Sequence, residues 1–345
     1  MSSPTPRVPI RPGEMRALGT TGIQVSAVGL GTWQMGAKWG PQDDELSLRT
    51  LHHALDAGCR FLDTAQDYGD GRSERLIGRF FRERGERVPV GTKVAPKDQV
   101  WETTPGVSQI RDKFPAQYLI DRCEVSLRNL GIDCLDVYYL HTWCPSWNQE
   151  TEWYETMLRL REQGKIKAIG ISVTDGRPDE ANGTIAAGRV DVVQLIYNLL
   201  DQRASTEVFP LARQHRAGIV ARVPLASGAL TATWTAQTTF AEDDWRHEVF
   251  TGQTLERTLR YVDHLRFLEP GSDGSLVEAA IRFCISDPTV SSVIPGSRSP
   301  QEVEGVMRAW RRGPLTAAEL QRVGELWQSE LRHHIQTSIQ KVARD

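Results

Sequence analysis

The chain has 345 residues, a formal net charge of −3 and a hydrophobic fraction of 39%, enough apolar residues to bury a sizeable core. This slightly acidic balance argues against a nucleic-acid partner, and no apolar run approaches the roughly 18 residues that would cross a membrane. The cysteines are odd in number and form no CxxC pair, which predicts reduced thiols in a cytoplasmic protein and neither a disulfide framework nor a metal site; they are Cys59, Cys123, Cys134, Cys144 and Cys284.

The first residues, 1–13, are polar and proline-containing, and we interpret them as a flexible leader because they lack the apolar segment of a signal peptide. Apolar and polar residues then alternate around Thr20–Thr21–Gly22, which predicts a β-hairpin leading into a first strand. Apolar strands alternate with amphipathic helices from there on. The expected strands are residues 28–31, 60–65, 88–94, 134–141, 166–172, 190–197, 219–225 and 291–296.

Each expected strand is followed by a helix, and only one irregular stretch, residues 226–275, interrupts the alternation. Eight such units without a linker predict a single (β/α)8 barrel, an α/β TIM barrel, over residues 14–330, with extra C-terminal helices and a tail at 331–345. A doubly wound open sheet is the alternative, but the G-x-G-x-x-G turn that usually follows an early strand of that fold is absent. The expected helices are residues 43–58, 73–84, 115–131, 151–164, 178–188, 205–218, 276–287, 299–312 and 316–330.

Asp63, Lys93 and His141 lie at the ends of the second, third and fourth expected strands, and Tyr68 follows the second. The C-terminal strand ends of a (β/α)8 barrel converge on one mouth. A buried Lys93 needs a counter-charge, which Asp63 on the neighbouring strand can supply. The cation should lower the pKa of Tyr68, so that the phenol exchanges a proton near neutral pH. His141 could donate a hydrogen bond to a carbonyl oxygen. Alone, each residue fits a packing or solvated role, and Asp67 is interpreted as a turn residue.

Several segments resemble signatures of the aldo-keto reductase superfamily: residues 60–78, 91–94, 126–141, 164–172 and 293–304. They occur in the family's order and extend the resemblance from about Met15 to about Trp327. The resemblance implies reduction of an aldehyde or ketone with a nicotinamide cofactor. It also implies that Tyr68 is the proton donor, that Lys93 and Asp63 tune its pKa, and that His141 orients the carbonyl.

The same resemblance implies a cofactor site. Ser172 and Gln194 would hold the nicotinamide carboxamide, although Val173 replaces a common asparagine, and Arg222 would take the place of a stacking aromatic. Gly296, Ser297 and Arg298 match the segment that holds the 2′-phosphate of NADPH, whereas Glu302 and Val306 replace a common Gln or Arg and a common Asn. NADPH is therefore expected, with NADH possible. The full set is Gly31, Thr32, Asp63, Ser172, Gln194, Arg222, Pro224, Leu225, Ser227, Leu230, Gly296, Ser297, Arg298 and Glu302.

Trp33 and Trp143 follow strand ends and are expected to line the mouth, where aromatic walls suit a sugar, a terpenoid or an aryl ketone. Trp234 and Trp245 either fold over the mouth or pack within the stretch 226–275. Two other functions remain open: a lyase that forms a Schiff base on Lys93, and a cofactor-binding regulatory subunit. The sequence predicts no oligomeric state.

Overall fold

The computed structural model describes residues 13–36, 42–242, 244–272 and 274–332, so nearly all of the expected leader and tail lies outside the described residues. The expected hairpin is confirmed, with β1 (Met15–Ala17) and β2 (Gln24–Ser26) paired antiparallel. Its apolar residues Leu18, Ile23 and Val25 are buried together with side chains of the barrel interior. The hairpin therefore covers one end of the barrel and leaves the other end for the mouth.

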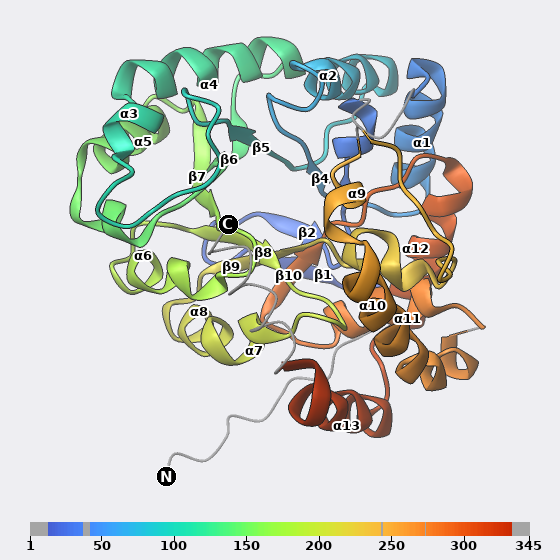
Figure 1. Cartoon of the computed structure of the whole chain (residues 1–345). Coiled ribbons are helices and arrows are strands. Elements are labelled where there is room, and N and C mark those ends of the chain that lie inside the picture. The colour runs from blue at the N-terminus through green and yellow to red at the C-terminus, as the bar shows by residue number, and fades with distance from the viewer. Residues whose placement is uncertain (1–12, 37–41, 243, 273, 333–345) are drawn as a thin grey trace.

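A closed barrel of eight parallel strands forms the centre of the molecule, which confirms the predicted (β/α)8 fold (Figure 1). Consecutive strands pair in chain order, and the bridges Val28–Val293 and Gly31–Gly296 join the last strand to the first. The strands are β3 (Leu30–Gly31), β4 (Leu62–Asp63), β5 (Val90–Val94), β6 (Leu135–Leu140), β7 (Ile166–Ser172), β8 (Val192–Ile196), β9 (Gly218–Arg222) and β10 (Val290–Val293).

Helices surround this barrel and present their apolar faces to the strands. The expected helix over residues 205–218 is divided at Val208, because Pro210 has no N–H to continue the helix and stands in the first turn of the second piece. The expected helix over 178–188 likewise begins as a 3-10 turn, Pro178–Ala181. The helices are α1 (Asp44–Asp56), α2 (Arg72–Arg84), α3 (Ile110–Lys113), α4 (Ala116–Leu130), α5 (Glu152–Glu162), α6 (Asn182–Ala186), α7 (Arg203–Glu207), α8 (Phe209–His215), α11 (Leu276–Ile285), α12 (Pro300–Arg312) and α13 (Ala317–Leu326).

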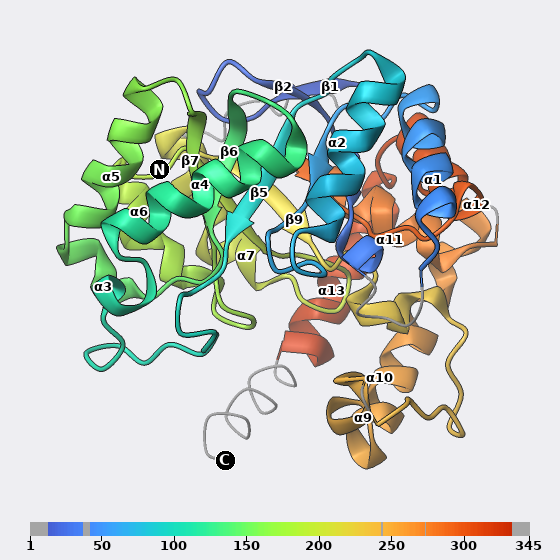
Figure 2. The same cartoon turned by 90° about the horizontal axis from the view of Figure 1, so that it is seen from above.

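The stretch 226–275 is not irregular throughout, which corrects the sequence interpretation. It contains α9 (Arg246–Val249) and the longer α10 (Gly252–His264). Leu255 and Val262, seven residues apart, are buried on one face of α10, but charged and threonine residues between them obscure the pattern. Figure 2 shows α9 and α10 at the end of the barrel opposite the hairpin, so this insertion stands beside the mouth.

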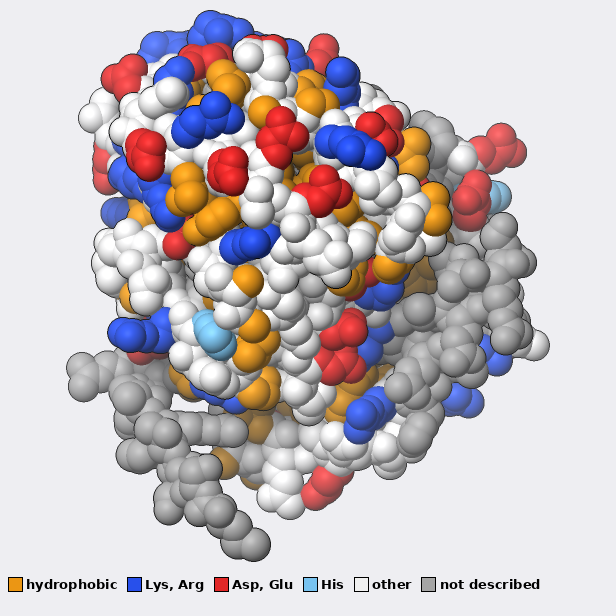
Figure 3. Space-filling model, turned by 90° about the vertical axis from the view of Figure 1, so that its left-hand side faces the viewer, with side chains coloured by type: hydrophobic (Ala, Val, Ile, Leu, Met, Phe, Trp, Pro, Cys, Tyr) orange, Lys and Arg blue, Asp and Glu red, His pale blue; other side chains and the backbone are white. Residues whose placement is uncertain are grey.

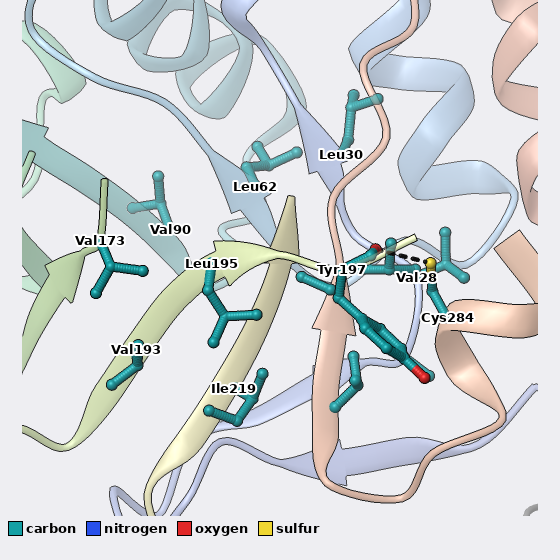
Figure 4. Close-up of a cluster of buried hydrophobic side chains, with 14 of the residues drawn as sticks. Val28, Leu30, Leu62, Val90, Val173, Val193, Leu195, Tyr197, Ile219 and Cys284 are labelled. Carbon is teal, nitrogen blue, oxygen red and sulfur yellow. Dashed lines mark hydrogen bonds between the residues drawn. The ribbon is translucent and has the colours of Figure 1, made fainter. Parts of the chain in front are cut away.

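The ring of Tyr139 fills part of the barrel interior. It lies so close to the neighbouring strands that the residues facing it, Gly91 and Gly170, have no room for a side chain. A Cβ on Gly170 would lie 2.2 Å from Cδ1 of Tyr139, and one on Gly91 would lie 2.9 Å from Cε2. A second apolar layer lies between strands and helices. Figure 4 shows part of this layer, where Sγ of Cys284 on α11 donates to the carbonyl oxygen of Tyr197 at 3.2 Å.

All five cysteines are free thiols. Within the described ranges, no helix has the length and apolarity that a membrane crossing needs. On the face shown in Figure 3, basic and acidic side chains are interspersed, so no large area of a single charge forms there.

Candidate active site

Lys93 lies near the C-terminal end of β5 and is fully buried. Its Nζ donates to Oδ1 of Asp63 at 2.5 Å, to the carbonyl oxygen of Thr64 at 2.8 Å and to the hydroxyl of Tyr68 at 3.1 Å. Burial acts to lower the pKa of Lys93, but the charge of Asp63 and the hydrogen bonds to Asp63 and Tyr68 favour the ammonium, so the pKa is raised. Lys93 is therefore positively charged at neutral pH, and each of its three ammonium protons donates a hydrogen bond.

The second oxygen of Asp63 is bound from the far side of the barrel. Oδ2 accepts from Nε2 of Gln194 at 2.7 Å, and Gln194 comes from β8, which stands opposite β4. Ser172 at the end of β7 is in register with Gln194, and both are buried. Two of the residues expected to hold the carboxamide thus lie next to the Lys93–Asp63 pair.

The pKa of Tyr68 departs from the sequence prediction. We expected Lys93 to lower it, and Lys93 does act in that direction, but burial of the phenol dominates and raises the pKa to about 12. The prediction was wrong because the sequence shows a neighbouring charge and not how far the hydroxyl is removed from water. Tyr68 is consequently a protonated phenol at neutral pH, and its hydroxyl accepts a hydrogen bond from an ammonium.

His141 follows β6 and packs against two aromatic rings. Tyr68 meets it edge-on with ring centroids 5.8 Å apart, and Trp101 does so at 4.8 Å. Oδ1 of Asp67 lies 3.1 Å from Nδ1 of His141. Burial lowers the pKa of His141, since it outweighs the raising effect of Asp67, and Lys93 adds to the lowering. The ring is therefore largely neutral at pH 7.

Sequence reasoning missed two of these neighbours. Asp67 was interpreted as a turn residue, and it does lie in a turn, but its carboxylate also faces His141. Its position directly before Tyr68 was a usable signal. Trp101 belongs to the long connection after β5, where nothing in the local sequence indicates contact with a histidine forty residues later.

The ends of β3 and β10 meet at the edge where the cofactor residues are expected. Gly31 bridges to Gly296, and a Cβ on Gly31 would lie 3.0 Å from the carbonyl oxygen of Ile294. The hydroxyl of Thr32 donates to the carbonyl oxygen of Asp63 at 2.9 Å. A Cβ on Gly296 would run into the side chain of Gln34, 2.0 Å from its Nε2. Glycine at both bridge positions therefore permits this close approach.

Unpaired polar atoms gather at three neighbouring strands. Oε1 of Gln34 after β3, Nε of Arg222 at the end of β9, and Oγ of Ser297 after β10 are buried without a hydrogen-bond partner among the described residues. Buried polar atoms are normally paired, so such a group fits a polar ligand that crosses all three strand ends. These residues fit a nicotinamide dinucleotide, and Ser297 and Arg222 were among those expected to bind one.

Arg222 is fixed by the connection after β7. Its Nη2 donates to the carbonyl oxygen of Val173 at 3.0 Å and pairs with Asp175. Val173 has no polar side chain, and it contacts the guanidinium of Arg222 through its backbone carbonyl oxygen instead. These contacts fix the planar guanidinium at the mouth.

The loop after β9 has a strained backbone. Val223, Ala226 and Ser227 have φ of +55°, +47° and +59°, the left-handed region that a β-branched residue rarely enters. Nδ2 of Asn198 holds the carbonyl oxygen of Val223 at 3.0 Å. The backbone N–H groups of Ala226, Gly228 and Leu230 donate to carbonyl oxygens within the loop, which stabilise this conformation. The loop contains the residues expected to hold the pyrophosphate: Pro224, Leu225, Ser227 and Leu230.

A cavity of about 320 Å³ opens beside this loop. It lies between Ser227, Phe250 and Thr254 of the insertion, and Leu331 near the end of the described chain. The insertion therefore contributes a wall beside the mouth.

Glu302 contacts Arg298 through the backbone of Arg298, at the start of α12. A carboxylate oxygen of Glu302 accepts from the backbone N–H of Arg298 at 2.7 Å, while Oγ of Ser299 accepts from the N–H of Glu302 at 3.3 Å, so both residues cap α12. Nε of Arg298 donates to Oε1 of Gln42 at 3.2 Å, and Nε2 of Gln42 donates to the carbonyl oxygen of Arg298 at 3.1 Å. Gln42 lies 256 residues away in sequence, and no sequence signal indicated this contact.

The family model of the aldo/keto reductase family matches residues 27–328. The chain belongs to this family. It is similar to the aldo-keto reductase YhdN of Bacillus subtilis, with 30% identity covering 85% of this chain and 87% of the relative. It is also similar to the NADH-specific methylglyoxal reductase of Escherichia coli, with 29% identity covering 83% and 90% of the two chains. The solved glycerol dehydrogenase AKR11B4 from Gluconobacter oxydans superposes with a TM-score of 0.77 at 27% identity, covering 92% and 97%.

As an aldo-keto reductase, the chain is an oxidoreductase that reduces carbonyl compounds with NAD(P)H. Among its tryptophans, Trp143 is placed differently from the sequence prediction. Trp143 is fully buried and packs edge-on against Trp147 and Trp153, with centroids 5.7 Å and 5.1 Å away, so it does not line the mouth. Trp33 begins the 3-10 turn after β3 and remains half-buried. Trp234 packs against phenylalanines of the insertion.

Proposed function

We propose that this aldo-keto reductase converts a small aldehyde or ketone into an alcohol, with Tyr68 as the proton donor and NADPH as the preferred cofactor. The observation that carries the proposal is the buried ammonium of Lys93, which donates to the Tyr68 hydroxyl at 3.1 Å and is neutralised by Asp63 at 2.5 Å. A bound nicotinamide would supply the hydride. The chain's own side chains then have to hold the carbonyl and deliver one proton to its oxygen.

Tyr68 delivers this proton. Burial keeps the phenol protonated until a carbonyl oxygen gains negative charge beside it. Lys93 stabilises the phenolate that remains, and Asp63, held by Gln194 at 2.7 Å, keeps Lys93 charged. His141 lies against the Tyr68 ring and contacts the same substrate oxygen. Trp101, whose ring also packs against His141, provides the aromatic wall that the sequence had assigned to Trp143.

The cofactor is held along the strand ends with unpaired polar atoms. Ser172 and Arg222 flank the nicotinamide, the left-handed loop at Ser227 receives the pyrophosphate, and Ser297 and Arg298 receive the 2′-phosphate. The carboxylate of Glu302 accepts a hydrogen bond at the start of α12. This contact reduces the repulsion between Glu302 and a phosphate, although the carboxylate keeps its charge. The preference for NADPH is therefore modest, and NADH is also used. The similar methylglyoxal reductase of Escherichia coli is NADH-specific, which supports a site in which Arg298 favours NADPH and Glu302 opposes it.

A Schiff-base lyase fits this site poorly. A lysine that attacks a carbonyl needs a free lone pair, whereas Lys93 has a raised pKa and donates three hydrogen bonds. A purely regulatory, cofactor-holding role would not require the buried ammonium to contact a tyrosine hydroxyl.

The test compares Tyr68→Phe with wild type on a panel of aldehydes and ketones, followed at the nicotinamide absorbance. We expect a loss of about 10²–10⁴ in rate with unchanged cofactor affinity by fluorescence titration. Tyr138→Phe is the matched control, because Tyr138 is also a buried tyrosine but donates to the carbonyl oxygen of Leu119, away from the mouth. A Tyr68→Phe variant that keeps its rate on a substrate whose chemistry is rate-limiting would remove Tyr68 from its assigned role.

A further inference from the structure

The cavity beside the loop after β9 is not used by the reaction proposed above. Its volume of about 320 Å³ is at the lower end of the range for small-molecule sites, about 300–1,000 Å³. Of the residues assigned to the cofactor only Ser227 lines it, and no catalytic side chain does. Its other walls come from the segment after β8, from α9 and α10 (Figure 2) and from Leu331. The cavity is therefore adjacent to the mouth but separate from the catalytic centre.

Most of the residues that line the cavity are apolar. Leu200 packs against a buried cluster that contains Tyr261 and Leu331, and all three side chains line the cavity. Val249 and Phe250 line it from the end of α9, and Val249 is 45% exposed. A ligand with an apolar body would remove this surface from water, which is favourable in proportion to the area covered.

Two charged residues line the cavity, and one of them is neutralised within the protein. Oδ1 of Asp201 accepts from Nε of Arg203 at 2.9 Å, and its other oxygen pairs with Nη2 of the same guanidinium. Arg257 on α10 donates from Nη2 to the amide oxygen of Gln253 at 3.2 Å, and no carboxylate of the described residues forms an ion pair with it. The cavity therefore combines an apolar wall with one positive charge that lacks a counter-charge.

We propose that this cavity is a second small-molecule site that takes an amphipathic monocarboxylate. Its aryl or branched alkyl body would pack on Leu200, Phe250 and Tyr261, and its carboxylate would accept from the guanidinium of Arg257. Arginine binds a carboxylate with paired, charge-assisted hydrogen bonds, which accounts for the head group. A ligand with a second charged group fits less well, because that group would lie against the apolar wall without a partner.

A ligand in this cavity also contacts the loop after β9. Ala226 and Ser227 line the cavity, and their φ angles of +47° and +59° are strained. Such a backbone persists only where its surroundings hold it, so a ligand packed against the loop should stabilise this conformation. Because the proposed function places the pyrophosphate on the same loop, the ligand and NADPH should strengthen each other's binding by the same factor. This coupling rests on the proposed function, whereas the carboxylate site does not.

The first test titrates 4-phenylbutyrate into the full chain without cofactor, followed by calorimetry. We expect one molecule to bind per chain, and Arg257→Gln to weaken this binding about tenfold to hundredfold. Thr254→Trp, which fills the cavity from α10, should abolish it. Arg266→Gln is the matched control, because it removes a positive charge just beyond α10 from a residue that does not line the cavity. A wild-type protein that does not bind 4-phenylbutyrate, or that binds it no more tightly than Arg257→Gln does, would overturn the proposal.

The second test titrates NADPH by fluorescence with and without saturating 4-phenylbutyrate. The dissociation constant of NADPH should fall about two- to tenfold with the carboxylate in wild type and stay unchanged in Arg257→Gln. A dissociation constant that rises in proportion to the carboxylate concentration would mean competition, so the cavity would belong to the cofactor site and the proposal would be overturned. An unchanged constant in wild type would refute the coupling. A lack of carbonyl turnover would refute the proposed function alone, because the calorimetric titration needs no turnover.

Discussion

Lys93→Met removes the ammonium that Asp63 faces inside the barrel, and we expect this change to lower the free energy of unfolding by about 3 kcal/mol. The methionine stem follows the path of the lysine stem, so the substitution opens no large cavity. What remains is a carboxylate that is 2% exposed and has lost a partner at 2.5 Å. Removing one member of a buried ion pair typically costs about 3–5 kcal/mol.

The structure places Lys93→Met at the lower end of that range. Oδ2 of Asp63 keeps its hydrogen bond from Nε2 of Gln194 at 2.7 Å, so the buried carboxylate is still stabilised by one donor. Adding Asp63→Asn to Lys93→Met removes the stranded charge, and the double variant should recover most of the lost stability. Lys167→Met is the matched control. Lys167 is half-exposed and pairs with Asp136 at 2.8 Å, so its loss should cost at most about 1 kcal/mol.

Urea unfolding at pH 7, followed by circular dichroism, measures these differences through the transition midpoint. The reasoning is refuted if Lys93→Met unfolds at the wild-type midpoint, or if the double variant is no more stable than Lys93→Met alone. Activity is a second readout. Both variants should be inactive in carbonyl reduction, since neither retains a cation to stabilise the Tyr68 phenolate, and this separates recovered stability from recovered function.

Three further predictions concern the cofactor site, the barrel interior and pH. Glu302→Gln keeps the helix cap, because glutamine also serves there, and should strengthen NADPH binding by about tenfold or less while NADH binding stays equal or weakens. Arg298→Ala should weaken NADPH binding far more than NADH binding. If the ratio of the two dissociation constants is unchanged in both variants, the 2′-phosphate binds elsewhere. Gly170→Ala should greatly reduce the yield and melting temperature of the folded protein, because the added Cβ would lie 2.2 Å from Tyr139; a normal melting temperature would contradict the packing. The lowered pKa of His141 means that the unfolded chain binds its proton more readily, so folding stability should fall as the pH drops below about 6.5; unfolding midpoints should show this loss in wild type and less of it in His141→Asn.

The sequence by itself determined the repeating architecture and the positions that carry chemistry. Strand and helix periods are local properties, so eight strand–helix units could be read in order, and the rule that strand ends share a mouth brought together Asp63, Lys93 and His141. The glycine-flanked segment after the second strand placed Tyr68 beside them. Spacing along the chain sufficed for these residues because the barrel converts it directly into position.

Only the tertiary structure decided the properties that depend on what surrounds each group. The pKa of Tyr68 is raised to about 12, and not lowered, because burial outweighs the charge of Lys93, and burial is a sum over many distant residues. Trp143 follows a strand end as predicted, yet its ring is packed away from the mouth by Trp147 and Trp153. The partnership of Arg298 with Gln42 joins residues 256 positions apart. Local pattern fixes which residues reach the mouth, whereas solvation, packing and long-range hydrogen bonds, which fix how they act, exist only once the chain has closed into the barrel.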